Sequence, residues 1–179
     1  MTAAKGGPRK YVIPLLRAVV VAVLAAALLR QQQTRMGTTA SASGGEAVSA
    51  TLPQLSGETL HLADYQGKVL TVNFFASWCA SCWNELNGFA RVSREYASKG
   101  VAVVGISVQS SPDDTRGMVD KLGLTFPVVL DAQGTVSQEQ LGLRGMPTTL
   151  FIDRQGRLLE NHTGELSEGQ LRSKLDGLL

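Results

Sequence analysis

The sequence predicts an α/β domain with a central mixed or parallel β-sheet flanked by helices, because strand-like and helix-like segments alternate. Two nearly continuous apolar, β-branched runs, Val69–Phe75 and Val101–Val108, are typical of strands buried on both faces. Between them, apolar residues recur at helical spacing; these are Leu86, Phe89, Ala90, Val92 and Tyr96. The 179 residues suffice for one such domain and an N-terminal appendage.

The N-terminal segment is typical of a chain that enters a membrane. Residues 1–10 are basic, and residues 11–29 form an apolar stretch close to the ~20 residues that span a bilayer, with Arg17 near its start. A cleaved signal peptide is the alternative, but Arg30–Arg35 is too polar and charged for a good cleavage region. We therefore predict a basic cytoplasmic N-terminus and an uncleaved, single-pass signal anchor.

This orientation places the rest of the chain beyond the bacterial cytoplasmic membrane, in the periplasm or another extracytoplasmic space. Residues 30–50 are rich in Gln, Thr, Ser, Ala and Gly and predict a flexible linker, which leaves residues 51–179 for the folded domain. Six of the 17 Lys and Arg residues but none of the 15 Asp and Glu residues precede position 36, so the remainder has a net charge of −4. No nucleic-acid partner is predicted for it.

The folded part begins with a turn and a short alternating strand. Within Leu52–Leu62, Leu60 and Leu62 point to one face, so His61 is expected to face solvent. Asp64–Lys68 is predicted to form a turn that leads into the first buried strand.

The later elements have clear start and stop signals. Gly100 is expected to end the first helix, Ser111–Asp114 to start a second one with a hydroxyl cap, and Gly123 to end that second helix. The remaining predictions are a strand at Phe126–Asp131, a short helix at Val136–Leu141, a hairpin of Leu150–Ile152 with Leu158–Leu159, and a C-terminal helix at Ser167–Leu179, capped by Ser167, with Leu171, Leu175 and Leu178 inward.

Cys79 and Cys82 are the only two cysteines of the chain, and they lie where the first buried strand ends and the helix begins. Unpaired N–H groups and the positive end of the helix dipole favour an anion at this position. We therefore expect Cys79 to be the attacking thiolate. Cys82 follows one turn later on the same helix face and is expected to be the more shielded, resolving cysteine.

Other interpretations of the cysteine pair fit less well. A structural zinc ion needs four ligands, yet only His61 and His162 remain and neither belongs to a spaced pair. A copper site lacks a nearby Cys, His and Met cluster, and a purely structural disulfide would close too short a loop to stabilise the fold much. We therefore predict redox chemistry without a metal or another cofactor.

Two motifs resemble the thioredoxin superfamily, and more narrowly its TlpA/ResA-like branch of membrane-anchored, extracytoplasmic thiol–disulfide oxidoreductases. The first motif is Asn73–Cys82 with Glu85 three residues later, and the second is Gly145–Asp153. The resemblance covers about residues 51–179. It implies a thioredoxin-like fold with an N-terminal β-hairpin extension.

The resemblance also implies a substrate-binding site. Met146 and Pro147 are expected to form a cis peptide bond beside the cysteines, where the main chain before the proline hydrogen-bonds an extended substrate segment. Trp78, directly before the attacking cysteine, is the third expected substrate contact. From the sequence alone, Pro147 is also explained as an ordinary turn or edge proline.

Glu85 stands at the position of a glutamate that, in the resembled branch, accepts and donates the proton of the resolving cysteine. The buried acid of the wider superfamily is replaced here by Asn73. A solvated helix glutamate is the alternative for Glu85. Between the cysteines, Ala80 and Ser81 depart from the proline common in the superfamily, and no His or Lys is present to stabilise the thiolate strongly, so we expect a reductant.

The predicted function is a membrane-tethered protein disulfide reductase. By resemblance, its partners would be disulfide-containing extracytoplasmic proteins, for example apocytochromes c during cytochrome c maturation or copper-delivery proteins, and a membrane thiol donor of electrons. A thiol peroxidase of the same fold is an alternative, although Ser77 stands where such enzymes usually carry Thr. A non-enzymatic binding module is the other alternative.

Overall fold

The structure is a computed structural model that describes residues 47–179. The predicted basic N-terminus at 1–10, the signal anchor at 11–29 and positions 30–46 of the predicted linker lie outside these residues. Within residues 47–179, no helix combines the length and the apolar character that a bilayer span requires.

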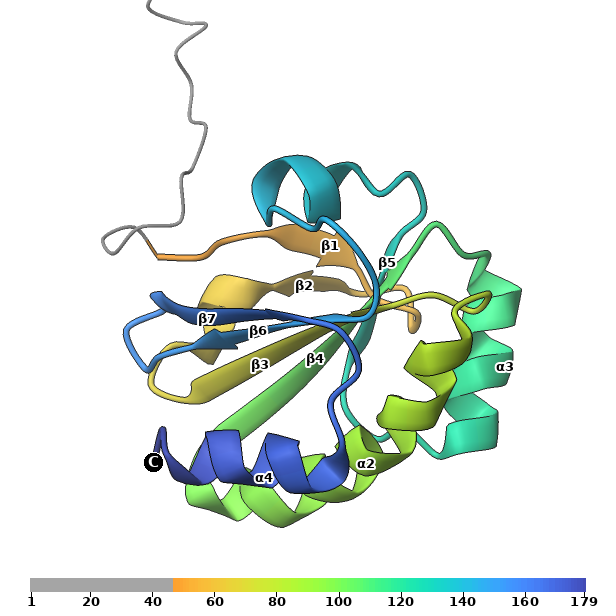
Figure 1. Ribbon diagram of the computed structural model, residues 1–179. Helices are drawn as coiled ribbons and strands as arrows, with labels where there is room; N and C mark the ends of the chain where they lie inside the picture. The colour runs from red at the N-terminus through yellow and green to blue at the C-terminus, as the bar shows by residue number, and fades with distance from the viewer. Residues whose placement is uncertain (1–46) are drawn as a thin grey trace, which may run out of the picture. The chain divides into compact units, whose positions relative to one another are not determined.

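A five-stranded mixed sheet forms the centre of the domain, which confirms the predicted fold class (Figure 1). The three strands that come first along the chain are mutually parallel, and the last two add to the opposite edge in antiparallel fashion. In spatial order the strands are β5 (Val128–Asp131), β4 (Val101–Val108), β3 (Val69–Phe75), β6 (Thr148–Ile152) and β7 (Leu158–Thr163).

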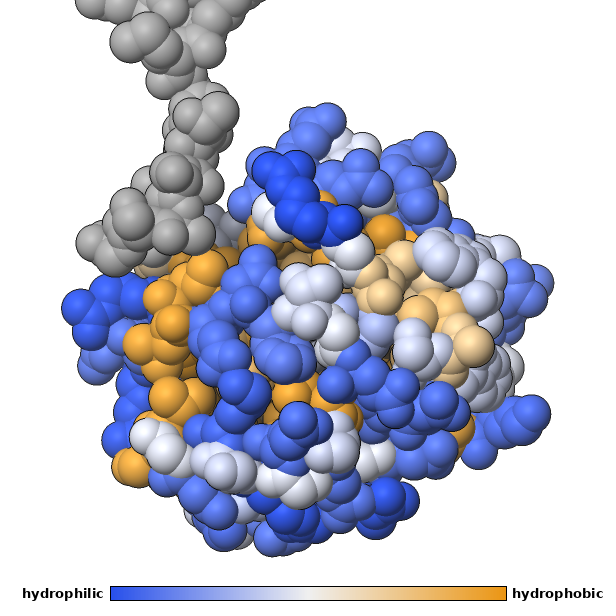
Figure 2. All heavy atoms as spheres, in the orientation of Figure 1, coloured by the Kyte–Doolittle hydropathy of each residue, from blue (hydrophilic) through white to orange (hydrophobic). Residues whose placement is uncertain are grey.

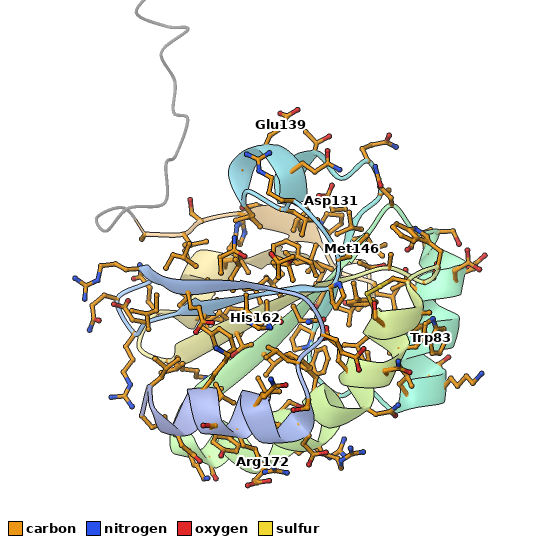
Figure 3. All side chains as sticks on the ribbon, in the orientation of Figure 1. Trp83, Asp131, Glu139, Met146, His162 and Arg172 are labelled. Atoms are coloured by element: carbon orange, nitrogen blue, oxygen red, sulfur yellow. A yellow bond between two sulfur atoms is a disulfide. The ribbon has the colours of Figure 1, made fainter. Side chains whose placement is uncertain are left out.

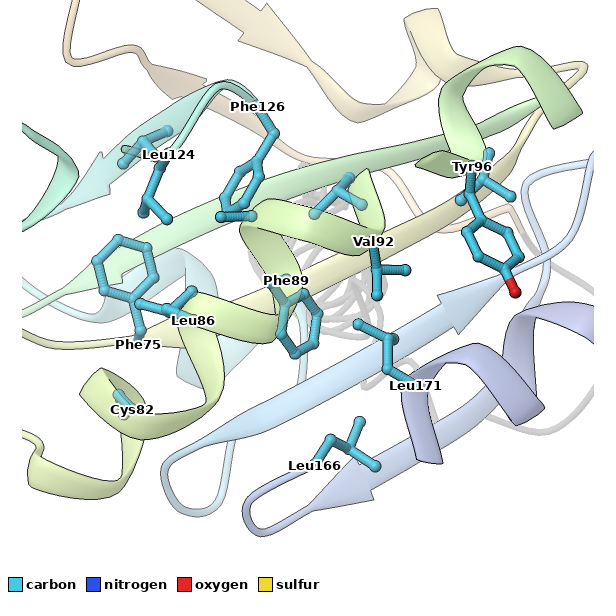
Figure 4. Packing of buried hydrophobic residues seen from close by; sticks show 14 of the residues in the cluster. Phe75, Cys82, Leu86, Phe89, Val92, Tyr96, Leu124, Phe126, Leu166 and Leu171 are labelled. Carbon is cyan, nitrogen blue, oxygen red and sulfur yellow. The ribbon is translucent and has the colours of Figure 1, made fainter. Parts of the chain in front are cut away.

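Three α-helices, α2 (Ala80–Tyr96), α3 (Pro112–Leu122) and α4 (Glu168–Asp176), contribute side chains to one hydrophobic cluster against a single face of the sheet. The chain passes from β3 to β4 and from β4 to β5 in the same direction, and right-handed connections then place α2 and α3 on the same face. Figure 4 shows the apolar side of α2 packed over the strands.

The opposite face is covered mainly by non-helical structure. The short strands β1 (Thr51–Pro53) and β2 (Thr59–His61) pair in antiparallel fashion there and share a second hydrophobic cluster with the inward side chains of the sheet. Two short helical segments also contribute to this cluster: the 3-10 helix Leu62–Tyr65 through Leu62 and Tyr65, and the five-residue segment Val136–Gln140 through Val136. Helical structure therefore lies on both faces, as predicted, but the three α-helices all pack on one face and only short helical segments pack on the other.

The glycine signals in the sequence correctly located the ends of the first two helices, α2 and α3. Tyr96 ends α2 and a short 3-10 turn leads to Gly100, which has a left-handed φ of 83°. Ser111 caps α3, and Gly123 ends it with a φ of 60°. These left-handed conformations are the ones that favour glycine after a helix.

The C-terminal helix α4 is shorter than predicted, since it ends at Asp176. Ser167 caps it in a reciprocal capping box with Gln170, as the sequence suggests. Leu171 and Leu175 are buried, and Leu178 packs partly buried against the same cluster although it lies beyond the helix end. The outer side of α4 is mostly hydrophilic, as Figure 2 shows.

Candidate active site

The two cysteines lie at the junction of the central strand and the helix that follows it. Cys79 is the N-cap residue of α2, and its sulfur accepts a hydrogen bond from the Cys82 backbone N–H at 3.3 Å. A disulfide joins the two cysteines. Cys79 retains 7% of its surface exposed, whereas Cys82 retains none and lies on the side of α2 that faces the sheet (Figure 4). Only Cys79 is therefore open to another molecule.

The segment that precedes Cys79 is held by the loop that follows β4. Ser77 donates its backbone N–H to the Ser110 hydroxyl at 2.9 Å, and the Trp78 indole N–H donates to the Gln109 carbonyl at 3.1 Å. Trp78 is otherwise 62% exposed. Its ring therefore lies at the surface in the residue next to Cys79, and its role as a substrate contact stays a prediction.

A second tryptophan stabilises the same segment from the inside. Trp83 donates its indole N–H to the Ser77 carbonyl at 2.9 Å. Its ring lies toward α3 (Figure 3), where the Lys121 ammonium is 5.3 Å from the ring centroid. The two indoles therefore differ in burial: Trp83 is partly buried between α2 and α3, whereas Trp78 is exposed.

Sequence reasoning missed Gln109 and Ser110, which lie about thirty positions after the cysteines and belong to no motif. The parallel pairing of β3 with β4 brings them to the site, because Phe75 lies opposite Ser107 and the two following loops meet at one edge of the sheet. The sequence did contain a signal for this, since parallel strands place the loops at their carboxyl ends side by side.

The second predicted motif lies beside the first. Phe74 pairs with Thr148 in the antiparallel β3–β6 register, which brings the preceding Met146 and Pro147 alongside the chain that leads to Cys79. The predicted cis peptide bond between Met146 and Pro147 is confirmed. Among residues 47–179, neither the N–H nor the C=O of Met146 has a hydrogen-bond partner, so both are free to bind an added peptide strand.

Glu85 is buried, with 3% of its surface exposed, so it is not the solvated helix residue that the sequence left as an alternative. One carboxylate oxygen accepts from the Asn73 amide at 2.7 Å, and the other accepts from the Leu166 backbone N–H at 2.9 Å. Asn73 also donates to the Thr149 hydroxyl at 3.1 Å. Strand β3, helix α2 and the segment before α4 thus meet at this carboxylate.

Burial raises the pKa of Glu85 to about 7, and the nearby charge of Glu165 adds to the rise, while the hydrogen bonds from Leu166 and Asn73 oppose it. A carboxyl group with this pKa exchanges its proton near neutral pH, which suits a general acid or base. Glu85 lies three residues after Cys82 and therefore on the same side of α2. The predicted proton transfer between the two remains a prediction.

No group of three or more His, Cys, Asp or Glu side chains close enough to hold a metal ion occurs within the described part of the chain. Of the two histidines, His61 is exposed on β2 and hydrogen-bonds Thr51, and His162 lies on β7 beside Glu160. Within residues 47–179, neither histidine forms a hydrogen bond or an ion pair with Cys79 or Cys82.

Comparison with known proteins extends what the motifs implied. A family model described as the AhpC/TSA family matches residues 43–160. The thiol-disulfide oxidoreductase ResA of Halalkalibacterium halodurans is 31% identical over 126 residues, which cover 70% of this chain and 71% of that protein. The chain belongs to the AhpC/TSA family. The thioredoxin-like protein YneN of Bacillus subtilis is 33% identical over 74% of this chain and 78% of its own length.

Solved structures of thiol–disulfide interchange proteins also resemble this AhpC/TSA-family protein. A Chlorobium tepidum protein proposed to be the thiol:disulfide interchange protein DsbE superposes with a TM-score of 0.71 at 27% identity, covering 77% of this chain and 99% of that one. The thioredoxin-like fold and the resemblance to ResA-like proteins are therefore confirmed. The protein is a thiol–disulfide oxidoreductase of the ResA/DsbE type, with Cys79 and Cys82 as its cysteine pair.

Proposed function

We propose that this oxidoreductase is tethered to the bacterial cytoplasmic membrane by residues 11–29 and reduces protein disulfides in the extracytoplasmic space. The basic start, the apolar stretch and the polar linker of the sequence support the tether. The unequal exposure of the two cysteines at the start of α2 supports the reaction. This exposure difference is the observation on which the proposal mainly rests.

The reaction is thiol–disulfide exchange in two steps. The Cys79 thiolate attacks one sulfur of the substrate disulfide, which forms a mixed disulfide and releases the other substrate sulfur as a thiolate. Cys82 then loses its proton to Glu85 and attacks the Cys79 sulfur, which releases the second substrate thiolate. Two electrons pass to the substrate, its two thiolates take up protons, and the protein is left with the Cys79–Cys82 disulfide.

The substrate is a disulfide-containing extracytoplasmic protein that presents an extended segment. The exposed ring of Trp78 and the unpaired main-chain groups of Met146 support the binding of such a segment. The haem-attachment cysteines of an apocytochrome c and the cysteines of a copper-delivery protein are the substrate classes that the family resemblance suggests. A membrane thiol donor would then return the cysteine pair to its reduced form.

The proposed direction rests on the absence of a cation between the cysteines. Ala80 and Ser81 provide no positive charge, and a strongly stabilised thiolate is what makes a cysteine pair oxidising. Equilibration of the purified protein with glutathione buffers, followed by thiol trapping, measures the direction. A couple as oxidising as that of a disulfide-forming enzyme would contradict the proposal.

The decisive experiment is substrate trapping in cells. Cys82→Ser leaves the attacking cysteine but removes the resolving one, so it should accumulate mixed disulfides with its substrates, which mass spectrometry identifies. Cys79→Ser is the matched control and should trap none. Equal trapping by both variants would show that the proposed division of roles is wrong. Peroxide consumption by the wild type at a rate exceeding disulfide reduction would instead favour a thiol peroxidase.

The tether requires a separate test. A cysteine-labelling reagent that does not cross membranes, applied to intact spheroplasts, should modify the reduced domain, and the full chain should remain with the membranes after an alkaline wash. A chain released into the wash, or one whose N-terminal sequencing begins after position 29, would contradict an uncleaved anchor.

A further inference from the structure

Gln109 has a backbone conformation that is uncommon for its residue type. Its φ is 49°, and it is the one non-glycine residue with a positive φ among residues 47–179. Residues with a Cβ atom avoid this left-handed region unless the surrounding structure imposes it. Such conformations cluster at functional sites, and Gln109 lies at the carboxyl end of β4, beside the segment that precedes Cys79.

The contacts around Gln109 impose this conformation. Its backbone N–H donates to the Asp131 carbonyl at 3.0 Å, and the same carbonyl accepts from the Gly134 N–H at 3.0 Å. Gly134 lies so close that a Cβ on it would be 3.3 Å from the Gln109 side-chain amide. The end of β5 and the turn after it therefore hold Gln109 on its amino side, and its carbonyl lies in the peptide unit that follows.

That carbonyl points to the indole N–H of Trp78, 3.1 Å away. The next residue, Ser110, is buried; its hydroxyl donates to the Val108 carbonyl and accepts from the Ser77 N–H. Two consecutive residues of one loop thus hold the two consecutive residues that precede the attacking cysteine. The left-handed turn at Gln109 allows its carbonyl and the Ser110 hydroxyl to serve both partners.

The two chain segments that make this contact carry no charged side chain. Neither residues 75–84 nor residues 105–112 include an Asp, Glu, Lys or Arg, although the Trp78 ring is largely exposed there. An exposed indole carried on such segments offers an apolar face that favours contact with apolar or aromatic side chains. A ring fixed by a hydrogen bond also loses less freedom when a partner binds.

We infer that Gln109 is a positioning residue for substrate: its left-handed turn fixes the Trp78 ring as a stacking surface for a peptide that carries an uncharged, apolar or aromatic side chain next to its disulfide. This inference rests on the proposed function, since it requires a peptide disulfide at Cys79. It assigns the site a preference for such peptides over small disulfides, which carry no apolar or aromatic side chain to stack on the ring.

Two substitutions at one position separate conformation from side chain. Gln109→Val and Gln109→Gly both remove the amide side chain, but only glycine adopts a positive φ without strain. In single turnovers of the reduced full chain in detergent with excess peptide, the KM is the peptide concentration that gives half the maximal rate. For a cyclic disulfide peptide with a phenylalanine beside one cysteine, we expect Gln109→Val to raise this KM roughly three- to tenfold, the effect of about one hydrogen bond. Gln109→Gly should stay within about twofold of wild type, because it retains the carbonyl position.

The control probe is cystamine, a small disulfide without a peptide chain. Its rate with Gln109→Val should match the wild-type rate, so that the loss is confined to KM for the peptide. Equal impairment by both substitutions would assign the effect to the lost amide side chain and overturn the inference. A parallel loss with cystamine would overturn it as well, because the cysteines themselves would then be disturbed.

Trp78→Phe tests the same contact without altering the loop. It keeps an aromatic ring but removes the indole N–H that donates to the Gln109 carbonyl, so it should raise the peptide KM in the same direction. A wild-type KM for Trp78→Phe would overturn the inference even if Gln109→Val does not fold. A wild type that reduces neither probe would instead refute the proposed function.

Discussion

The Asn73 amide on strand β3 donates a 2.7 Å hydrogen bond to the buried carboxylate of Glu85 on helix α2. The wider thioredoxin pattern suggested an acid at position 73, whereas this chain has the amide there and carries the acid on the neighbouring helix. The carbonyl oxygen of Asn73 is buried and has no partner among residues 47–179. Rotation of the amide brings this oxygen to Glu85, where it accepts a hydrogen bond from the neutral carboxyl group, so the same pair accommodates both protonation states.

The first prediction concerns the pH dependence of the second exchange step. Because Glu85 must be ionised to accept the Cys82 proton, the resolution rate of a Cys79 mixed disulfide should rise with pH with a midpoint at about 7. Glu85→Gln should abolish this rise. Stopped-flow measurement of thiol release from pH 5 to 9 (about the range of a neutral acid or base) provides the test.

The matched control for that experiment is Glu165→Gln. Its carboxylate is exposed, and its charge contributes to the raised pKa of Glu85, so its removal should keep the pH-dependent rise and move the midpoint slightly lower. An unchanged profile in Glu85→Gln would show that another group takes the Cys82 proton.

The second prediction concerns stability. The folded state holds the Glu85 proton more tightly than the unfolded chain does, since the pKa rises from 4.5 to about 7. The free energy of unfolding should therefore fall by up to about 3 kcal/mol as the pH rises from 4.5 to about 7. Above this range, the Glu85 contribution should no longer change with pH. Glu85→Gln should remove this slope. Urea unfolding of the oxidised protein at several pH values measures it; a flat wild-type profile would contradict the assigned pKa.

The third prediction uses the contact between positions 73 and 85. Asn73→Asp places a second carboxyl group against Glu85, and two buried carboxyl groups at hydrogen-bond distance cannot both ionise readily. The variant should be near wild-type stability at acidic pH, where the pair shares a proton, and markedly less stable at alkaline pH. Asn87→Asp adds the same charge on the exposed side of α2 and should show no such loss. Similar pH profiles for the two variants would argue against the buried pair.

The fourth prediction concerns the packing behind the site. A Cβ on Gly105 in β4 would lie 2.9 Å from the Phe75 ring and 3.1 Å from the Phe126 ring, so Gly105→Ala should destabilise the domain by about 1–3 kcal/mol. Gly117 on α3 has open space around it, and Gly117→Ala should instead add about 0.4–1 kcal/mol. Chemical denaturation compares the two. An equal effect of both substitutions would contradict the packing of the rings over Gly105.

Local signals in the sequence were sufficient for most elements of the fold. The apolar run at Val101–Val108 and the cap at Ser111 specify their structure within a few residues, and both were located correctly. The end of α4 was placed too late, at Leu179, because apolar spacing continues past Asp176. Spacing shows which side of a segment is buried but does not show where its last helical hydrogen bond lies.

The cysteine pair and its place at a strand–helix junction were determined by the sequence itself, because they depend on residues within one turn of each other. Only the tertiary structure decided that Glu85 is buried and that Gln109 reaches Trp78. The first depends on contacts with Asn73 and Leu166, and the second on the parallel register of β3 with β4. Burial and long-range hydrogen bonds are made by residues far apart along the chain, and no local pattern encodes them.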